Sequence, residues 1–229
     1  MGYLPQRAHR YLLACGLATP LFVVVILVEG AFRPDYEPWH RFGSELALGD
    51  RGGVQTTNFV VTGLLVLAFA VGLRRALAGG RGAIAAPTLA ALFGLSCVIG
   101  GVFPTDPSPG YPAGTVGVEE PTTAGMIHDA NPALFYPSLL GLMLVIAWRF
   151  AAKQRAWTWI SIGGAILVIV TTVMFVSQFN MDTQSGEFHG LWQRINLAVC
   201  FGWIAAIAGR LLADSTNQES YRPLPLKAE

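Results

Sequence analysis

Three residues near the middle of the chain have the side chains needed for proton transfer. His128 and Asp129 are adjacent, and Asp106 precedes them in the segment Phe103-Pro104-Thr105-Asp106. Histidine titrates near neutral pH, and a neighbouring carboxylate can orient its ring. If the protein is an enzyme, we expect His128 to be the catalytic acid or base and Asp106 or Asp129 to position it. Asp129 also has a simpler interpretation as a capping residue, because the helix dipole favours a carboxylate in the first turn of a helix.

A second polar group surrounds Arg194. This residue follows Glu187, where the last apolar helix is expected to begin, by seven residues, which places it about 10 Å below the helix end. An arginine at that depth costs several kcal/mol unless it is paired, faces water or reaches the interface. We expect Arg194 to form an ion pair with a neighbouring helix, to anchor a lipid phosphate or substrate carboxylate, or to extend to the interface. The other expected ligand-binding residues are Gln193, His189, Ser44 and His40.

Metal and nucleotide sites are not favoured. A zinc ion could in principle take His128, His189 and Asp106, with His40 as a further ligand, but these residues belong to different segments and form no close-spaced motif. We therefore expect no metal site, and the sequence identifies no cofactor. There is no Walker A sequence and no GxGxxG fingerprint. The basic residues form short groups rather than a patch or stripe, which argues against nucleic acid as a partner.

Long apolar stretches must position these residues. About 20 apolar residues in a helix cross the hydrocarbon core of a bilayer, and the chain contains six such stretches. The sequence therefore predicts an all-α polytopic membrane protein, a six-transmembrane-helix bundle that forms a single domain over residues 1–229. The expected spans are approximately 10–31, 55–75, 82–102, 126–148, 156–177 and 187–212.

The charges predict the orientation of the bundle. The N-terminus, the connections after the second and fourth spans and the C-terminal tail hold 11 of the 15 basic residues. The other three connections and the adjoining helix ends hold 11 of the 14 acidic residues, from Glu29 to Glu187. By the positive-inside rule, both termini are cytoplasmic, residues 213–229 form a cytoplasmic tail, and the acidic face looks outward from the plasma (cytoplasmic) membrane.

Two outward connections have patterns of their own. In residues 38–48, Trp39, Phe42 and Leu46 recur at helical spacing, and we expect a short interfacial helix with these side chains toward the lipid and His40 and Ser44 on another face. Residues 104–122 are rich in proline and glycine and predict an irregular cap over the bundle. The three cysteines fall within predicted spans, which disfavours a disulfide framework.

Three stretches carry a resemblance to a known family. They are Phe42-Gly43-Ser44-Glu45-Leu46-Ala47-Leu48-Gly49 with the following Val54-Gln55-Thr56-Thr57-Asn58-Phe59, then Gly101-Val102-Phe103-Pro104-Thr105-Asp106, and Gly190-Leu191-Trp192-Gln193-Arg194. From about residue 10 to 212, the chain resembles the bacterial and archaeal membrane proteins called domain of unknown function 998. The resemblance implies a six-helix integral membrane protein and implies no particular activity.

Three functions remain open. The first is a binding protein whose outward polar pocket takes a lipid head group or a small polar ligand. The second is an enzyme that acts at the same face on a lipid or isoprenoid-like substrate. The third is a structural subunit of a membrane complex or a homo-oligomer, in which the polar residues only join helices. The bilayer is the expected partner in all three.

Overall fold

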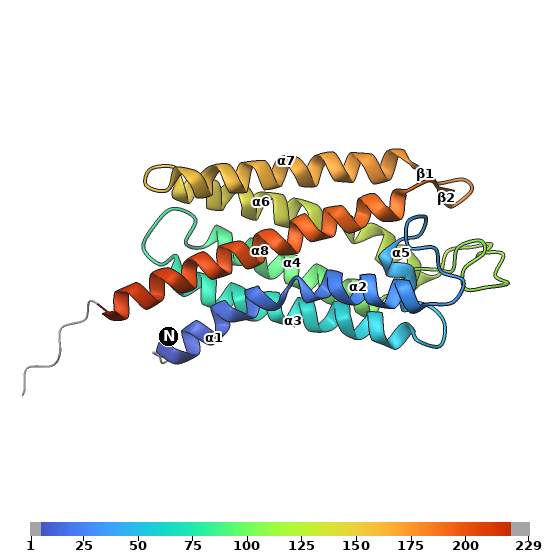
Figure 1. Cartoon of the computed structure of the whole chain (residues 1–229), viewed down its shortest axis with the longest axis horizontal. Helices are drawn as coiled ribbons and strands as arrows, with labels where there is room; N and C mark the ends of the chain where they lie inside the picture. Colours follow the sequence, from blue (N-terminus) through green and yellow to red (C-terminus); the bar gives the residue numbers. More distant parts are fainter. Residues whose placement is uncertain (1–5, 221–229) are drawn as a thin grey trace, which may run out of the picture.

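The computed structural model describes residues 6–220, and the side chains of residues 7–215. Six helical segments are long and apolar enough to cross a membrane, and they lie side by side in one elongated bundle (Figure 1). These segments are Arg7–Phe32, Gly52–Ala76, Ala85–Val102, Thr123–Phe150, Arg155–Ser177 and His189–Ser215. The prediction of an all-α, six-helix membrane bundle is confirmed.

Two of the six segments are built from more than one helix. The first consists of α1 (Gln6–Ala14), the 3-10 helix η1 (Cys15–Ala18) and α2 (Leu21–Phe32). Pro20 has no N–H to continue the α-helical ladder, and Thr19 compensates by donating its hydroxyl to the carbonyls of Gly16 (2.8 Å) and Phe201 (3.1 Å). The fourth consists of α5 (Thr123–Ala130) and α6 (Pro132–Phe150).

The other spans are single helices: α3 (Gly52–Ala76), α4 (Ala85–Val102), α7 (Arg155–Ser177) and α8 (His189–Ser220). Helix α8 continues beyond residue 213, where the cytoplasmic tail was expected to begin; residues 221–229, with Arg222 and Lys227, lie outside the described part. Helices α3 and α4 can approach closely because Gly63 has no side chain. A Cβ on Gly63 would lie 2.6 Å from the carbonyl oxygen of Gly94.

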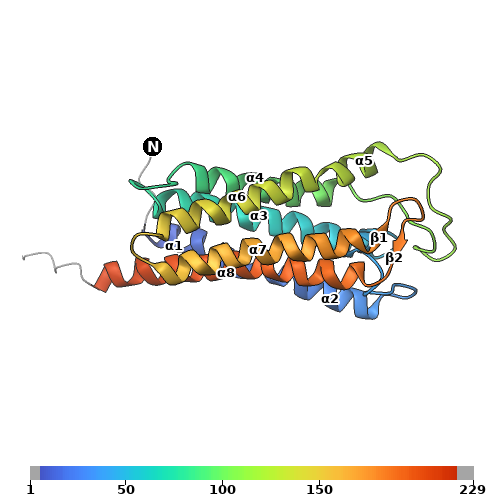
Figure 2. The same cartoon turned by 90° about the horizontal axis from the view of Figure 1, so that it is seen from above.

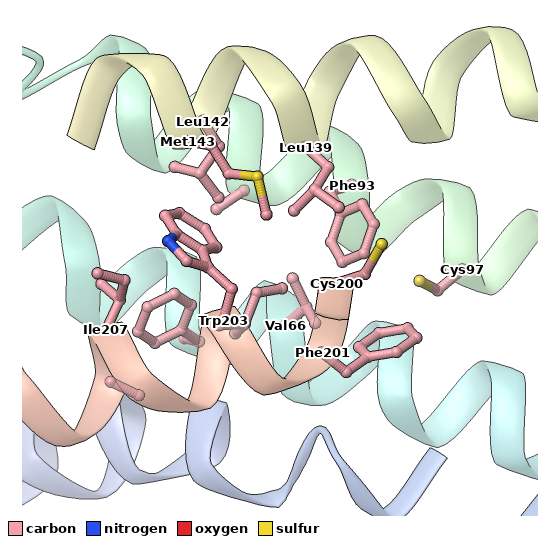
Figure 3. Close-up of a cluster of buried hydrophobic side chains, with 14 of the residues drawn as sticks. Val66, Phe93, Cys97, Leu139, Leu142, Met143, Cys200, Phe201, Trp203 and Ile207 are labelled. Atoms are coloured by element: carbon pink, nitrogen blue, oxygen red, sulfur yellow. The ribbon is translucent and has the colours of Figure 1, made fainter. Parts of the chain in front are cut away.

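The middle of the bundle is a packed apolar core. Figure 3 shows side chains from several helices meeting there, among them Phe93, Met143, Phe201 and Trp203. Cys97 and Cys200 are buried free thiols in the same region, and Cys15 is also free. Because the middle of the bundle has few polar groups, its core positions the helices. The candidate functional residues lie nearer the ends of the bundle.

The connecting segments gather at two ends of the bundle, which we name by their charge (Figures 1 and 2). The acidic end carries the connections from α2 to α3, from α4 to α5 and from α7 to α8. The basic end carries the start of α1 and the connections from α3 to α4 and from α6 to α7. The three connections at the acidic end, residues 33–51, 103–122 and 178–188, are called the acidic cap below.

The first connection of the acidic cap folds differently from expectation. It contains a short 3-10 helix, η2 (Gly43–Ala47), rather than an amphipathic helix on the membrane surface. Leu46 is fully buried, whereas Trp39 is 46% exposed, so the two side chains do not share a lipid-facing side. The prediction of one apolar face was wrong because the segment turns inward, toward buried polar partners that spacing alone does not reveal. The third connection forms a hairpin of β1 (Phe179–Asn180) and β2 (Ser185–Gly186).

Candidate functional site

Arg33 is the centre of a buried cluster that fixes the acidic cap to the end of α2. Its Nη1 donates to the carbonyl of Leu48 (2.9 Å), and its Nη2 donates to the carbonyl of Leu46 (3.1 Å) and to the carboxylate of Glu29 (3.3 Å). Arg51 donates to the same carboxylate from Nη2 (2.5 Å). One buried carboxylate therefore pairs with two guanidinium groups, and the loop closes around them.

Arg41 joins the first connection of the acidic cap to the second. Its Nη1 donates to Glu45 Oε1 (3.1 Å) and Ser108 Oγ (2.9 Å), and its Nη2 donates to the carbonyl of Pro109 (3.0 Å). The Ser108 hydroxyl donates to the same Glu45 oxygen. The Arg41 side chain remains 18% exposed, and its Nε–H and second Nη2–H make no hydrogen bond within the described residues.

Arg194 joins the acidic cap to α8. It is 3% exposed, and its Nη1 donates to the carbonyls of Arg41 (3.0 Å) and Gly190 (2.9 Å), while its Nη2 donates to the hydroxyl of Tyr36 (2.6 Å). Neutral acceptors thus take the place of the ion pair that was one of the three arrangements considered from the sequence. Among the described side chains, no carboxylate pairs with Arg194, and its Nε has no hydrogen-bond partner. The buried part of the acidic end therefore holds an uncompensated positive charge.

Tyr36 connects Arg194 to a residue of the first loop and also lines a surface hollow. Its hydroxyl accepts from Arg194 and donates to the carbonyl of Phe42 (2.9 Å), and the Arg194 guanidinium carbon lies 5.6 Å from the centre of the Tyr36 ring. Burial raises the pKa of Tyr36 to about 12, although the adjacent Arg194 opposes this shift. The phenol is therefore neutral at physiological pH and keeps its proton for Phe42.

A hollow of about 530 Å³ opens on the surface directly over Tyr36. It is lined by Asp35, Tyr36, Glu37, Arg41 and Gly110. Asp35 adopts a positive φ of 56°, a left-handed conformation that aspartate tolerates better than most residues. Asp35 and Glu37 are exposed and are called the rim below, whereas Tyr36, at 5% exposure the most buried lining residue, is called the floor. The hollow is thus polar, with carboxylates at its mouth and a guanidinium in its wall.

The predicted ligand-binding residues lie beside this hollow and do not line it. Gln193 Oε1 accepts from the backbone N–H of Gly43 (2.8 Å). His189 is 2% exposed, with its ring centre 4.6 Å from that of Phe42 and its Nδ1 without a hydrogen-bond partner among the described residues. His40 is half-buried with its ring 5.1 Å from that of Phe188, and Ser44 is half-buried in η2. Arg194 alone reaches the hollow, through Tyr36.

Gly190 allows the acidic cap to rest on the start of α8. A Cβ at this position would collide with the backbone carbonyls of Arg41 and Pro38. One residue later, the N–H of Leu191 donates to the carbonyl of Trp39 (3.1 Å), which uses one of the unpaired donors at the start of the helix. The loop backbone and the helix can be this close only because residue 190 has no side chain.

Asp106 caps α5. Its Oδ2 accepts from the N–H of Thr122 (2.8 Å) and its Oδ1 from the Thr122 hydroxyl (2.6 Å), and the same hydroxyl oxygen accepts from the N–H of Gly125 (3.0 Å). Asp129 was expected in the first turn, but α5 begins at Thr123, so Asp129 lies near the end of this helix and is exposed. The carboxylate at the helix start is therefore Asp106, and the capping interpretation of Asp129 was wrong.

His128 has a fixed ring. Its Nδ1 lies 2.8 Å from the carbonyl oxygen of Phe103, a contact that requires the proton to be on Nδ1 and leaves Nε2 as an acceptor when the ring is neutral. In the described part of the chain, neither Asp106 nor Asp129 makes a hydrogen bond to His128. The contacts of this residue and those around Arg194 share no partner, so the predicted catalytic and ligand-binding residues form two separate groups.

The described residues bring together no group of three or more His, Cys, Asp or Glu side chains that could hold a metal ion. His128 contacts Phe103 and Phe59, whereas His189 contacts Phe42 and Phe179. The zinc arrangement considered from the sequence, with His128, His189 and Asp106, therefore has no geometric support.

Sequence reasoning missed the residues that line the hollow. A usable signal was present: in Arg33-Pro34-Asp35-Tyr36-Glu37-Pro38, two carboxylates flank an aromatic residue between two prolines, and Arg41 precedes Glu45 at i, i+4 spacing. Pairs at this spacing meet on one side of a helical turn. Arg194 could be identified from the sequence because burying a charge in a membrane span costs free energy. The exposed rim residues Asp35 and Glu37 carry no such cost, so nothing in the sequence marks them in that way.

A comparison with family models assigns this chain to a family. No curated protein and no solved structure matches it. The family model described as "Protein of unknown function (DUF998)" matches residues 17–210, a range that contains the whole acidic cap and at least part of every span. Because this match covers well over half of the 229 residues, the chain belongs to the DUF998 family.

Proposed function

We propose that this protein binds a lipid head group in the hollow of the acidic cap, with the acidic end on the outer side of the cytoplasmic membrane. The orientation rests on the positive-inside rule, since most Lys and Arg residues gather at the basic end. The observation that carries the proposal is that two exposed aromatic residues flank, along the chain, the residues that line the hollow.

Phe32 and Trp39 flank the hollow along the chain. Phe32 is the last residue of α2 and is 78% exposed, and it precedes the rim residue Asp35 by three residues, or about 10 Å of extended chain at most. Trp39 is 46% exposed and follows the other rim residue, Glu37, by two positions. Trp side chains such as Trp39 are enriched at head-group level in membrane proteins, and Phe32 marks the end of the apolar span. This position favours a lipid head group over a solute from bulk water.

The lining also suits a head group. Arg41 has two N–H groups left after its contacts with Glu45, Ser108 and Pro109, and a guanidinium is well matched to phosphate oxygens. Tyr36 is held from behind by Arg194, so the floor is rigid before any ligand arrives. A site whose groups are already held in place loses less entropy on binding.

Native mass spectrometry of the detergent-purified protein tests the proposal. We expect the wild type to carry a bound lipid, Arg41→Gln to lose it, and Arg155→Gln, which changes an exposed arginine at the basic end, to keep it. Because Arg41 also links two loops, Glu37→Trp provides a second test, since it adds bulk at the exposed rim without touching an ion pair. A lipid-free wild type, or equal lipid retention in all variants with unchanged thermal stability, would contradict the proposal and favour a purely structural subunit.

A membrane enzyme is the second candidate, because the Phe103 carbonyl orients the His128 ring as a general base requires. Under this alternative, His128→Gln abolishes turnover of a lipid that the purified wild type consumes, and leaves the unfolding temperature unchanged. Lipid that is bound but chemically unaltered after prolonged incubation with wild type would count against it.

A further inference from the structure

The carboxylates of the acidic cap fall into two classes. Glu29 and Glu45 are buried and form ion pairs with arginines of the cap. Asp35 and Glu37, on the rim of the hollow, are exposed and form no ion pair with any described residue. Two unpaired negative charges therefore line the hollow at its exposed rim, on residues that flank Tyr36 in the sequence.

The positive charges lie deeper. Arg41 is in the wall of the hollow with two unused N–H groups. Arg194 donates a hydrogen bond to Tyr36, which forms the floor, and is 3% exposed. It has no carboxylate partner among the described side chains, and its Nε has no acceptor there. A buried cation without a counter-charge is costly, and an anion close by relieves that cost. The hollow is thus negative at its mouth and positive at its floor.

We infer that the head group bound in this hollow is zwitterionic, with its phosphate toward Arg41 and the Tyr36 floor and its amine toward Asp35 and Glu37. This inference rests on the proposed function. A purely anionic head group would have to pass two carboxylates, and a purely cationic one would meet Arg41 and the charge of Arg194. Only a ligand with both charges, such as phosphoethanolamine, meets an opposite charge at each level.

Lipid titrations of the delipidated protein, followed by native mass spectrometry, test this inference. We expect the wild type to bind phosphatidylethanolamine about tenfold more tightly than phosphatidylglycerol with the same acyl chains. Asp35→Asn/Glu37→Gln removes both rim charges without removing a buried contact. This double variant should bind phosphatidylethanolamine and phosphatidylglycerol about equally. The matched control is Glu119→Gln/Glu120→Gln, which removes two exposed carboxylates from the second connection of the same cap and should keep the preference.

The outcomes separate this inference from the proposed function. Equal binding of the two lipids by the wild type, or an unchanged preference in the rim variant, overturns the zwitterion assignment while the head-group site itself survives. Binding of neither lipid removes both. Soluble phosphoethanolamine distinguishes the source of the ligand: displacement of the bound lipid means that the head group alone is recognised, whereas no displacement means that the acyl chains contribute and the ligand is a membrane lipid.

Discussion

Arginine residues occupy both ends of the bundle, and the two ends use them differently. At the acidic end, Arg33 and Arg194 are less than 10% exposed and hold loops to helices through carbonyl and carboxylate acceptors. At the basic end, Arg74 and Arg155 are exposed, and Arg149 donates from Nη1 to the carbonyls of Leu77 and Arg81. Arg33 and Arg194 at the acidic end are therefore part of its fold, whereas Arg74 and Arg155 at the basic end lie on the surface.

Breaking one ion pair at each end gives the largest expected contrast. Glu29→Gln removes the carboxylate shared by Arg33 and Arg51, and leaves Arg33 buried without a counter-charge, so the free energy of unfolding should fall by about 3 kcal/mol. Asp214→Asn breaks the Arg210–Asp214 pair at the basic end, where the Asp214 side chain is 40% exposed, and should cost less than about 0.5 kcal/mol. Unfolding titrations in mixed detergent micelles measure both, and similar losses would refute the distinction between the two ends.

The packing of the acidic cap on α8 should be the next most sensitive feature. Gly190→Ala places a methyl group against the backbone carbonyls of Arg41 and Pro38, and the expected loss is about 2 kcal/mol. Gly163→Ala in α7 is the control, because a Cβ there meets no atom within 4 Å and alanine favours the helix. Thermal unfolding should therefore separate the two variants clearly, and a harmless Gly190→Ala would mean that the cap can move away from α8.

A smaller effect tests a difference within the acidic end itself. Asp106→Ala removes both hydrogen bonds to Thr122, and should cost about 1 kcal/mol, confined to the start of α5. Asp129→Ala changes an exposed side chain on the same helix and should stay within about 0.5 kcal/mol. Hydrogen exchange of residues 122–126 reports the local change, and faster exchange in both variants alike would argue against a specific cap.

The fold was predictable from the sequence because the bilayer imposes a simple rule. Each span needs about 20 apolar residues, and the expected bounds differ from the helical segments by no more than three residues at any end. The need of Arg194 for polar partners was also predictable, because a cation at that depth must find acceptors. Its partners were not predictable: Tyr36 is 158 positions away, and the acceptors on Arg41 and Gly190 are backbone carbonyls, which leave no trace in residue type.

The hollow could not be predicted for a related reason. It depends on the conformation of residues 33–51, where apolar spacing suggested a lipid-facing helix, and where the contacts of Arg33 and Arg41 instead turn Leu46 inward. Exposed charges such as Asp35 and Glu37 have no burial cost to mark them in a sequence. Their position becomes meaningful only when a buried Tyr36 lies between them.

The contacts of the acidic cap come from parts of the chain that are synthesised at different times. Glu29, Arg33, Arg41, Glu45 and Arg51 all belong to one short stretch, so these pairs can form as soon as α2 and α3 have been made. Arg194 arrives with the last helix. A chain truncated before α8 leaves the Tyr36 hydroxyl and the Arg41 carbonyl without their donor. The insertion of α8 therefore completes hydrogen bonds in the acidic cap that the earlier helices cannot supply.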